Sequence, residues 1–380
     1  MDFDDEVERG VEELNLLFLN EPEPEKVVIQ AINPSIWNNL PPDILERVIH
    51  HLPALSLLKF RTICRDWYRL ISSRSFSHYC NDPWFAIFPT KPSNHFSAFN
   101  PDLNKWHKLS LSFLPCDCNG LSSSGGLICC KGVINNSLSI IVCNPISQNY
   151  VILPPLLRKR IVPIVNIINL GLGFRVIVAG DDVLADGHSV SDLTSEIYDS
   201  ATGEWSMSGR LPPQSDLEFG SAFCRGILYV PTYRPIGTVR FDPQLGMWSR
   251  VPAFVPRNSR NASLVECSGR LFMVGGVQRK QSIVGIRVWE LCDCSVWREF
   301  ARMRRQVLRK MKLRLGDLYF SAVGHGDFIC LSIYESPVMI GFNIADKKWI
   351  WLPQFPWVGS FDGVHLLGHP YKPTLHTPVD

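Results

Sequence analysis

Histidines near the ends of predicted strands are the first residues in this sequence that could carry out chemistry. His325, His365 and His369 hold such positions, where imidazoles could ligate copper. Two histidines four residues apart on a strand, however, share a face only loosely. The pattern therefore does not predict a metal site.

Paired cysteines and one glycine-rich stretch are the other candidates. Cys116 with Cys118, and Cys292 with Cys294, are separated by one residue, whereas zinc knuckles favour two to four. We interpret both pairs as packed thiols. The stretch GLGF at residues 171–174 lacks the remaining glycine of a dinucleotide loop, and no Walker or nucleophile-elbow pattern occurs. The sequence predicts no catalytic residue, no metal and no cofactor.

A basic segment runs from Arg298 to Arg314. Its apolar residues recur every four positions, which predicts a helix with its basic side outward; they are Met303, Val307, Met311 and Leu315. The candidate target-binding residues on this helix are Arg302, Arg305, Arg309 and Lys312. Two interpretations stay open, namely contact with an acidic or phosphorylated partner or a nucleic acid, and a solvated basic face. Nucleic acid is disfavoured because no aromatic residue is interleaved with the charges.

The segment from Leu40 to Ile71 contains two helical periods and two proline stops. Pro41-Pro42-Asp43 is typical of a helix start, and the first helix is expected to end near His51, before Pro53. A second amphipathic stretch follows. Helices this short cannot bury all of their large apolar side chains, so some of this surface is expected to bind a partner.

The whole pattern of this segment resembles an F-box. The resemblance implies binding to a Skp-type adaptor and, through it, to a cullin of a ubiquitin ligase. The implied adaptor-binding residues are Leu40, Pro41, Ile44, Leu45, Val48, Ile49, Leu52, Leu57, Leu58, Cys64 and Trp67.

Composition and charge indicate the cellular compartment of the protein and the character of the segment before this module. The 380 residues are 46% hydrophobic and 19% charged, with no apolar run long enough to cross a membrane and no signal peptide. The twelve cysteines are not regularly spaced as in a disulfide scaffold, which favours reduced thiols. We therefore expect the protein in the cytoplasm, the nucleus or both. Residues 1–34 contain ten acidic residues and two basic ones, which predicts an acidic disordered leader.

A repeat fills the remainder of the chain. An apolar residue, an Asn or Asp, a short polar turn and an aromatic residue recur five times, and a degenerate copy, WELCDCSVWREF, brings the number of copies to six. The aromatic positions are Trp106, Tyr150, Trp205, Trp248, Trp297 and Trp349. Each copy predicts a β-hairpin, and further strand candidates precede most copies, so each period of about 50 residues contains about four strands.

The repeats resemble kelch motifs and the F-box-associated repeats of plant F-box proteins. The fold class is therefore multidomain α+β, with a short helical F-box followed by an all-β six-bladed propeller of four-stranded blades. The first copy has only three strand candidates, and Val364–Leu367 is a spare one. We expect this C-terminal strand to close the ring on the blade made by residues 84–109.

The expected domains are the leader at 1–34, the F-box at 35–72, a linker at 73–83, the propeller at 84–370 and a tail at 371–380. The implied function is that of a non-catalytic, substrate-recognition subunit of an SCF-type ubiquitin ligase. The alternative is a propeller that binds a carbohydrate or regulates transcription, with an F-box used only for its own turnover. The sequence does not identify the target protein.

Overall fold

The computed structural model describes residues 41–50, 70, 83–160, 163–180, 194–213, 215–280, 282–293, 295–315, 319–357, 360–374 and 377–379. The chain divides into two units, Met1–His51 and Leu52–Asp380. Among the described residues, no helix is long and apolar enough to cross a membrane.

The described part of the first unit is the helix α3, Pro42–His50. The carbonyl of Pro41 accepts hydrogen bonds from the backbone N–H groups of Ile44 and Leu45, both at 3.0 Å. Proline needs no hydrogen-bond partner in the first turn, and Asp43 lies beside the positive end of the helix dipole. The helix begins and ends close to the positions that the sequence predicted.

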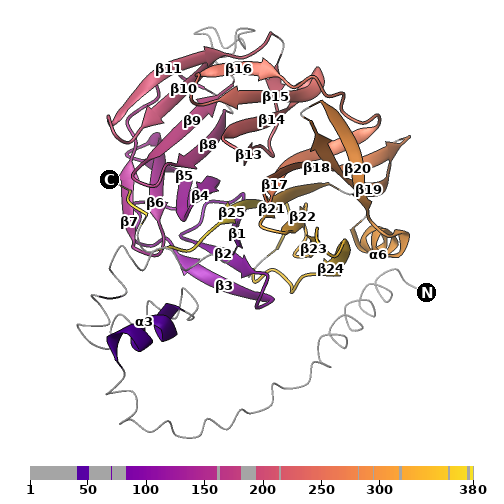
Figure 1. Ribbon diagram of the computed structural model, residues 1–380, viewed down its shortest axis with the longest axis horizontal. Coiled ribbons are helices and arrows are strands. Elements are labelled where there is room, and N and C mark those ends of the chain that lie inside the picture. Colours follow the sequence, from indigo (N-terminus) through magenta and orange to yellow (C-terminus); the bar gives the residue numbers. More distant parts are fainter. Residues whose placement is uncertain are drawn as a thin grey trace, which may run out of the picture. The chain divides into compact units, whose positions relative to one another are not determined.

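The second unit is a six-bladed β-propeller, viewed along its axis in Figure 1, as the repeat predicted. The first blade contains β1 (Trp84–Pro89), β2 (His95–Asn100), β3 (Lys105–Ser110) and β25 (Leu366–Tyr371). The second contains β4 (Cys118–Ser124), β5 (Leu127–Ile134), β6 (Ser137–Asn144) and β7 (Asn149–Ile152). The third contains β8 (Ile164–Asn169), β9 (Phe174–Ala179), β10 (Thr194–Asp199) and β11 (Glu204–Arg210).

The fourth blade has a divided inner strand. It contains β12 (Asp216–Leu217), β13 (Ala222–Cys224), β14 (Ile227–Arg234), β15 (Ile236–Asp242) and β16 (Met247–Arg250). The fifth contains β17 (Ser259–Cys267), β18 (Arg270–Arg279), β19 (Ser282–Cys292) and β20 (Val296–Arg302), and is followed by α6 (Arg305–Leu315). The sixth contains β21 (Phe320–His325), β22 (Phe328–Ile333), β23 (Met339–Asn343) and β24 (Lys348–Trp351).

The repeated motif forms the hairpin between the last two strands of each blade. In the first blade, Asn100 Oδ1 accepts the backbone N–H of Asp102 at 2.9 Å, and Asp242 Oδ1 accepts that of Gln244 at 2.9 Å in the fourth. This bond fixes a tight turn, so the aromatic residue six positions later faces the strand before it. Phe99 thus lies opposite Trp106, with ring centroids 5.0 Å apart.

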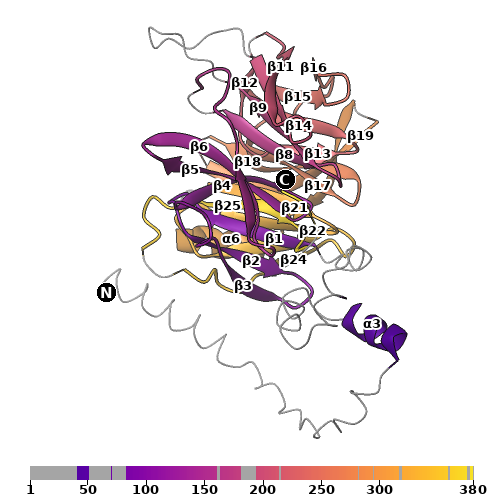
Figure 2. The same cartoon turned by 90° about the vertical axis from the view of Figure 1, so that its left-hand side faces the viewer.

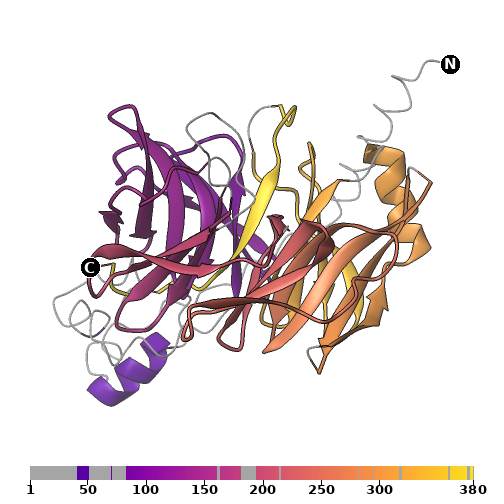
Figure 3. The ribbon, with the colours of Figure 1, turned by 90° about the horizontal axis from the view of Figure 1, so that it is seen from above.

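The ring is closed by β25, which is the innermost strand of the first blade. It pairs antiparallel with β1, from Trp84 opposite Tyr371 to Pro89 opposite Leu366. Figures 2 and 3 show β25 in yellow between the beginning and the end of the propeller, beside β4 and β21. The predicted closure on the first blade is confirmed.

The closing strand begins two residues later than predicted. The carbonyl of Val364 accepts the N–H of Glu335 in the sixth blade at 3.0 Å, and the ladder with β1 begins only at Leu366. The left-handed Gly363, with a φ of 65°, turns the chain so that Val364 still bonds to the sixth blade before the strand reaches β1.

The residues after β25 pack on the second blade. Asn144 Nδ2 donates to the carbonyl of Thr374 at 2.9 Å, and Thr377 Oγ1 donates to that of Gly125 at 2.8 Å. Val379 is buried against the second and third blades. The segment expected as a tail thus extends the closure beyond Tyr371.

Antiparallel strands give the propeller two distinct faces. The turn face bears the repeat turns, for example Pro101–Asn104, and the hairpins between first and second strands. The connection face bears the links between blades, for example 251–258 and 303–319. The chain enters the propeller at Pro83, before β1, and Pro83 lies against Gly326 in a hairpin of the turn face.

Candidate binding surfaces

The first candidate surface is the apolar side of α3. Pro41 and Ile44 are exposed and Leu45 is half-buried, and the exposed fraction of Ile44 is 36%. These residues recur at helical spacing, so they present a continuous apolar strip. Such a strip can bind another protein but offers no group for bond chemistry.

Most of the other predicted adaptor-binding residues lie outside the described residues. Val48 and Ile49 are placed on the backbone of α3. The remaining ones are Leu40, Leu52, Leu57, Leu58, Cys64 and Trp67.

The second candidate surface is α6, whose beginning differs from the prediction. Residues 298–302 belong to β20, which pairs with β19, and the helix begins at Arg305. The segment after Trp297 is the outer strand of a repeat hairpin. Its pairing with β19 therefore outweighs the preference for a helix that the spacing of its apolar residues indicates. Arg302 is therefore a strand residue, and its guanidinium lies 2.6 Å from the carboxylate of Glu299.

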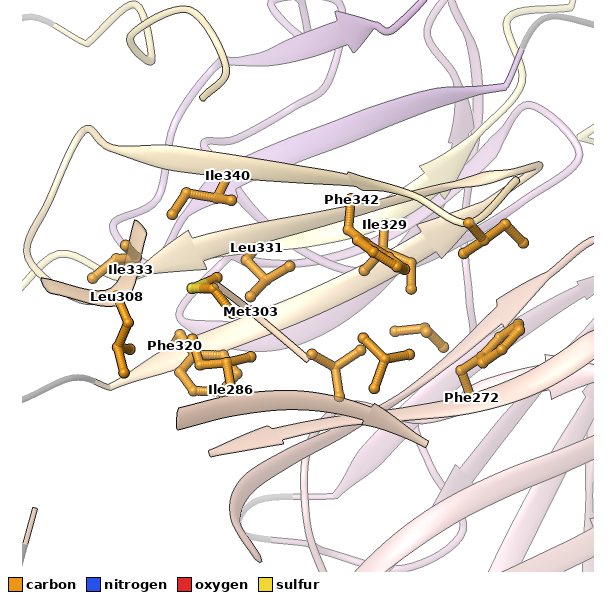
Figure 4. Close-up of a cluster of buried hydrophobic side chains, with 14 of the residues drawn as sticks. Phe272, Ile286, Met303, Leu308, Phe320, Ile329, Leu331, Ile333, Ile340 and Phe342 are labelled. Atoms are coloured by element: carbon orange, nitrogen blue, oxygen red, sulfur yellow. The ribbon is translucent and has the colours of Figure 1, made fainter. Parts of the chain in front are cut away.

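Apolar residues in and before α6 hold it against the fifth and sixth blades. Met303 and Leu308 point into the cluster that contains Ile286, Phe320 and Ile333, as Figure 4 shows. Met311 is fully buried in the same cluster. The helix is thus a fixed part of the propeller surface, as the recurrence of its apolar residues every four positions predicted.

The outward side of α6 is basic. Arg305 and Arg309 are exposed, as are Arg304 and Lys310, while the side chain of Lys312 lies outside the described residues. No acidic residue lies in the first turn of the helix. The helix belongs to the connection face, opposite the face where the chain enters the propeller. Arg304 and Lys310 belong to the basic segment that the sequence showed, outside the four residues chosen as candidates.

The histidines named above lie at the closure of the ring. His325 Nδ1 lies 3.0 Å from the carbonyl of Trp84, and the ring of His369 lies 5.9 Å from that of Phe88. Burial lowers the pKa of His325 and of His365, and it lowers the pKa of His369 to about 4. In the described part of the chain, no group of three or more His, Cys, Asp or Glu could hold a metal ion.

The cysteine pairs are thiols. Cys116 Sγ and Cys118 Sγ lie 3.9 Å apart, and burial raises the pKa of Cys116 to about 11. A thiol with so high a pKa is a poor nucleophile at neutral pH. Cys292 is a free thiol too, and Cys294 lies outside the described residues.

Two family models match this chain. An F-box domain model matches residues 37–79, and the model of the F-box protein At3g26010-like β-propeller matches residues 103–321, more than half of the chain. The chain belongs to this family of F-box proteins. The F-box match extends into the segment 73–83, which the sequence suggested as a linker. The propeller itself, from β1 to β25, extends beyond the matched range on both sides.

Curated plant proteins are similar to this chain, two of those named here over most of its length. The chain is 28% identical to Protein UNUSUAL FLORAL ORGANS of Arabidopsis thaliana, over 92% of this chain and 88% of the relative. It is 26% identical to the F-box/kelch-repeat protein At5g43190 of the same plant, over 86% and 84%. A shorter match, 26% identical over 31% of this chain and 38% of the relative, is to SKP1-interacting partner 15 of Arabidopsis thaliana. The resemblance to F-box/kelch-repeat proteins is confirmed.

Proposed function

We propose that this F-box protein is the substrate-recognition subunit of an SCF-type ubiquitin ligase. The observation that carries the proposal is that an F-box and a six-bladed propeller are joined in one chain. The F-box binds a Skp-type adaptor, which connects it to a cullin, and the propeller binds a target protein. The name of the relative SKP1-interacting partner 15 supports the adaptor as partner.

The receptor contributes no bond chemistry of its own. Its effect is to hold the target and the ubiquitin-conjugating enzyme in one assembly, which raises the effective concentration of the target lysine by orders of magnitude. The proposal places the protein in the cytoplasm or nucleus, where reduced thiols such as that of the buried Cys118 persist.

The target binds the connection face, with α6 at its edge. Charge supports this choice, because Arg305 and Arg309 are exposed on a helix that buried Met303 and Leu308 hold in place. A rigid basic surface favours an acidic partner and accelerates its approach.

The test is affinity isolation of the full chain with and without Leu45→Asp combined with Ile49→Asp. The unmodified chain is expected to recover adaptor, cullin and a protein that accumulates when the proteasome is inhibited. The double variant places charges in an apolar contact at a cost of several kcal/mol, which abolishes a micromolar complex.

Arg47→Gln is the matched control, since Arg47 is an exposed polar residue of the same helix. It should leave adaptor recovery unchanged. Recovery of the adaptor with the double variant would refute the F-box interface. Recovery of adaptor and cullin without any accumulating target would favour an F-box that serves only the turnover of this protein.

A further inference from the structure

The inner strand of the fourth blade is interrupted, and the interruption displays a phenylalanine. β12 and β13 both pair with β14, and between them the N–H of Glu218 donates to the carbonyl of Pro231 at 2.9 Å. Phe219 follows and is 65% exposed. Irregularities of this kind redirect side chains at sheet edges and are frequent next to binding sites.

Contacts with the fifth blade fix the interruption in place. The carbonyl of Gly220 accepts the N–H of Leu264 at 2.7 Å. Gly220 has a φ of 93°, and a Cβ atom there would lie 3.0 Å from Ser263 Cα. Only glycine fits this backbone without strain, so the position of Phe219 is determined by the packing of two blades.

A second exposed ring lies in the connection between β16 and β17. Phe254 is 94% exposed, although its neighbour Ala253 is buried. Pro252 and Pro256 flank it and restrict the backbone. An aromatic side chain has only two rotatable bonds, so on a restricted backbone it loses little conformational entropy on binding, which suits it to anchor a partner.

Packing brings the two phenylalanine segments to the same seam between blades, because Ala222 and Ala253 belong to one buried cluster of the fourth and fifth blades. Hydrogen bonds connect the Phe254 segment to the exposed Arg260. Arg260 Nε donates to Gln278 Oε1 at 2.7 Å, and the N–H of Gln278 donates to the carbonyl of Asn258 at 2.8 Å. Asn258 ends the connection that contains Phe254. Arg260 also lies close enough to Glu218 to oppose the rise that burial causes in the pKa of that carboxyl. We call Phe219, Phe254, Arg257 and Arg260 the anchor patch.

The surroundings of the anchor patch are basic. Arg279 and Lys280, in the hairpin between β18 and β19, are exposed on the same connection face, as is α6. Of the acidic residues nearby, Asp216 in β12 is exposed, Glu218 is half-buried, and Glu299 is engaged by Arg287 and Arg302, so the positive charges of Arg257, Arg260, Arg279 and Lys280 are in excess. Aromatic residues with arginines are the composition of binding hot spots, and the excess positive charge selects an acidic partner.

We infer that the anchor patch binds an acidic polypeptide segment that contains aromatic or large aliphatic side chains, which pack against Phe219 and Phe254. This site deepens the proposed function, on which it rests, by naming the chemistry of the target. Charge brings the segment to the connection face, and the apolar anchor selects among acidic segments.

The test compares two fluorescently labelled polymers of equal length, polyglutamate and a glutamate–tyrosine copolymer, binding to the full chain in complex with its adaptor. The copolymer is expected to bind at least threefold more tightly by fluorescence anisotropy. Phe219→Ser combined with Phe254→Ser should remove this difference. Arg257→Gln combined with Arg260→Gln should weaken the binding of both polymers.

Leu172→Ser is the matched control, because Leu172 is 87% exposed in the hairpin between β8 and β9, on the turn face. It should preserve the preference for the copolymer. Equal affinities for the two polymers, or an equal loss in the Leu172 variant, would overturn the inference. Adaptor binding is measured on the same samples, so failure of the patch is distinguished from failure of the F-box.

Discussion

At the scale of residues, single indole N–H groups join neighbouring blades. Trp205 Nε1 donates to the carbonyl of Pro154 at 2.8 Å, and Trp106 Nε1 donates to that of Pro353 at 2.9 Å, each in the preceding blade. Both acceptors are prolines at the end of a repeat. The aromatic residue of the motif therefore stabilises its own hairpin through its ring and the adjacent blade through its nitrogen.

Trp205→Phe should destabilise the propeller more than Trp297→Phe. Both tryptophans are 8% exposed, but the buried Trp297 Nε1 has no hydrogen-bond partner in the described part of the chain. The difference in the free energy of unfolding should be about 1 to 3 kcal/mol, since only Trp205→Phe leaves a carbonyl unpaired. Thermal or urea unfolding of both variants measures it. Equal losses of unfolding free energy in the two variants would show that only the volume of the ring, and not the indole hydrogen bond, contributes to stability.

At the scale of elements, α6 is an insertion in the connection between the fifth and sixth blades. Its apolar side completes the core between those blades, while its basic side adds charge to the connection face. Packing thus uses one side of this helix, and the binding that we propose uses the opposite side. Changes to the basic side should leave folding intact.

Reversing Arg305 and Arg309 to Glu should weaken target binding by about 1 to 2 kcal/mol, or about five- to thirty-fold in Kd. Dependence of the affinity on salt should decrease, because exposed charges act through a screened field. Adding the reversal of Arg302 should have less effect, since Glu299 already neutralises it. Lys312 is the fourth of the target-binding residues that the sequence predicted, and its charge can be reversed in the same way.

The control reverses Lys105 and Lys348, which are exposed on the turn face. The same change in net charge there should leave target affinity within about twofold. Titration of the isolated target at two salt concentrations makes the comparison. Unchanged affinity in the Arg305 and Arg309 variant would show that the basic side of α6 is only a solvated face with no role in target binding.

At the scale of the whole molecule, the ring depends on a strand taken from the opposite end of the chain. β25 fills the innermost position of the first blade, and Ser332 Oγ and Ser123 Oγ donate to its carbonyls from the sixth and second blades at 2.6 Å each. Three blades thus meet on this strand. Its loss would expose the edge of β1 and open the cores on both sides.

A chain that ends at Trp357 should aggregate, because an unpaired edge and uncovered apolar clusters remain. A chain that ends at Lys372 keeps β25 and should stay monomeric, with a modest loss of stability from the missing contacts of Thr377 and Val379. Size-exclusion chromatography and thermal unfolding distinguish the two. A soluble, cooperatively unfolding chain that ends at Trp357 would contradict the closure.

Acidification should weaken the same closure. The folded-state pKa of His369, about 4, lies below the unfolded value near 6.5, so the unfolded chain binds protons first as the pH falls. Stability should therefore decrease between about pH 6.5 and about 4, and His325 and His365 contribute in the same direction. Urea unfolding at pH 7.5 and 5.5 tests this, and His369→Gln should reduce the difference between the two. An unchanged difference in that variant would exclude His369 as a source.

Features that depend on residues close together in the chain were predictable from the sequence. In five of the six copies an Asn or Asp opens the repeat turn six residues before the aromatic residue, so hairpins and blade number followed from local rules. The amphipathic period likewise fixed α3 and the buried side of α6. The helical docking motif was recognisable because its apolar residues are contiguous in sequence.

Only the tertiary structure decided the features that depend on contacts between distant segments. Whether the closing strand begins at Val364 or Leu366 depends on a turn at Gly363 and on β1, and whether Arg302 is helical depends on its pairing with β19. No local pattern in the sequence marks Phe219 and Phe254 as exposed residues. They are exposed because a glycine bulge and two prolines hold the backbone outward, and the full packing of blades decides which side chains remain outside.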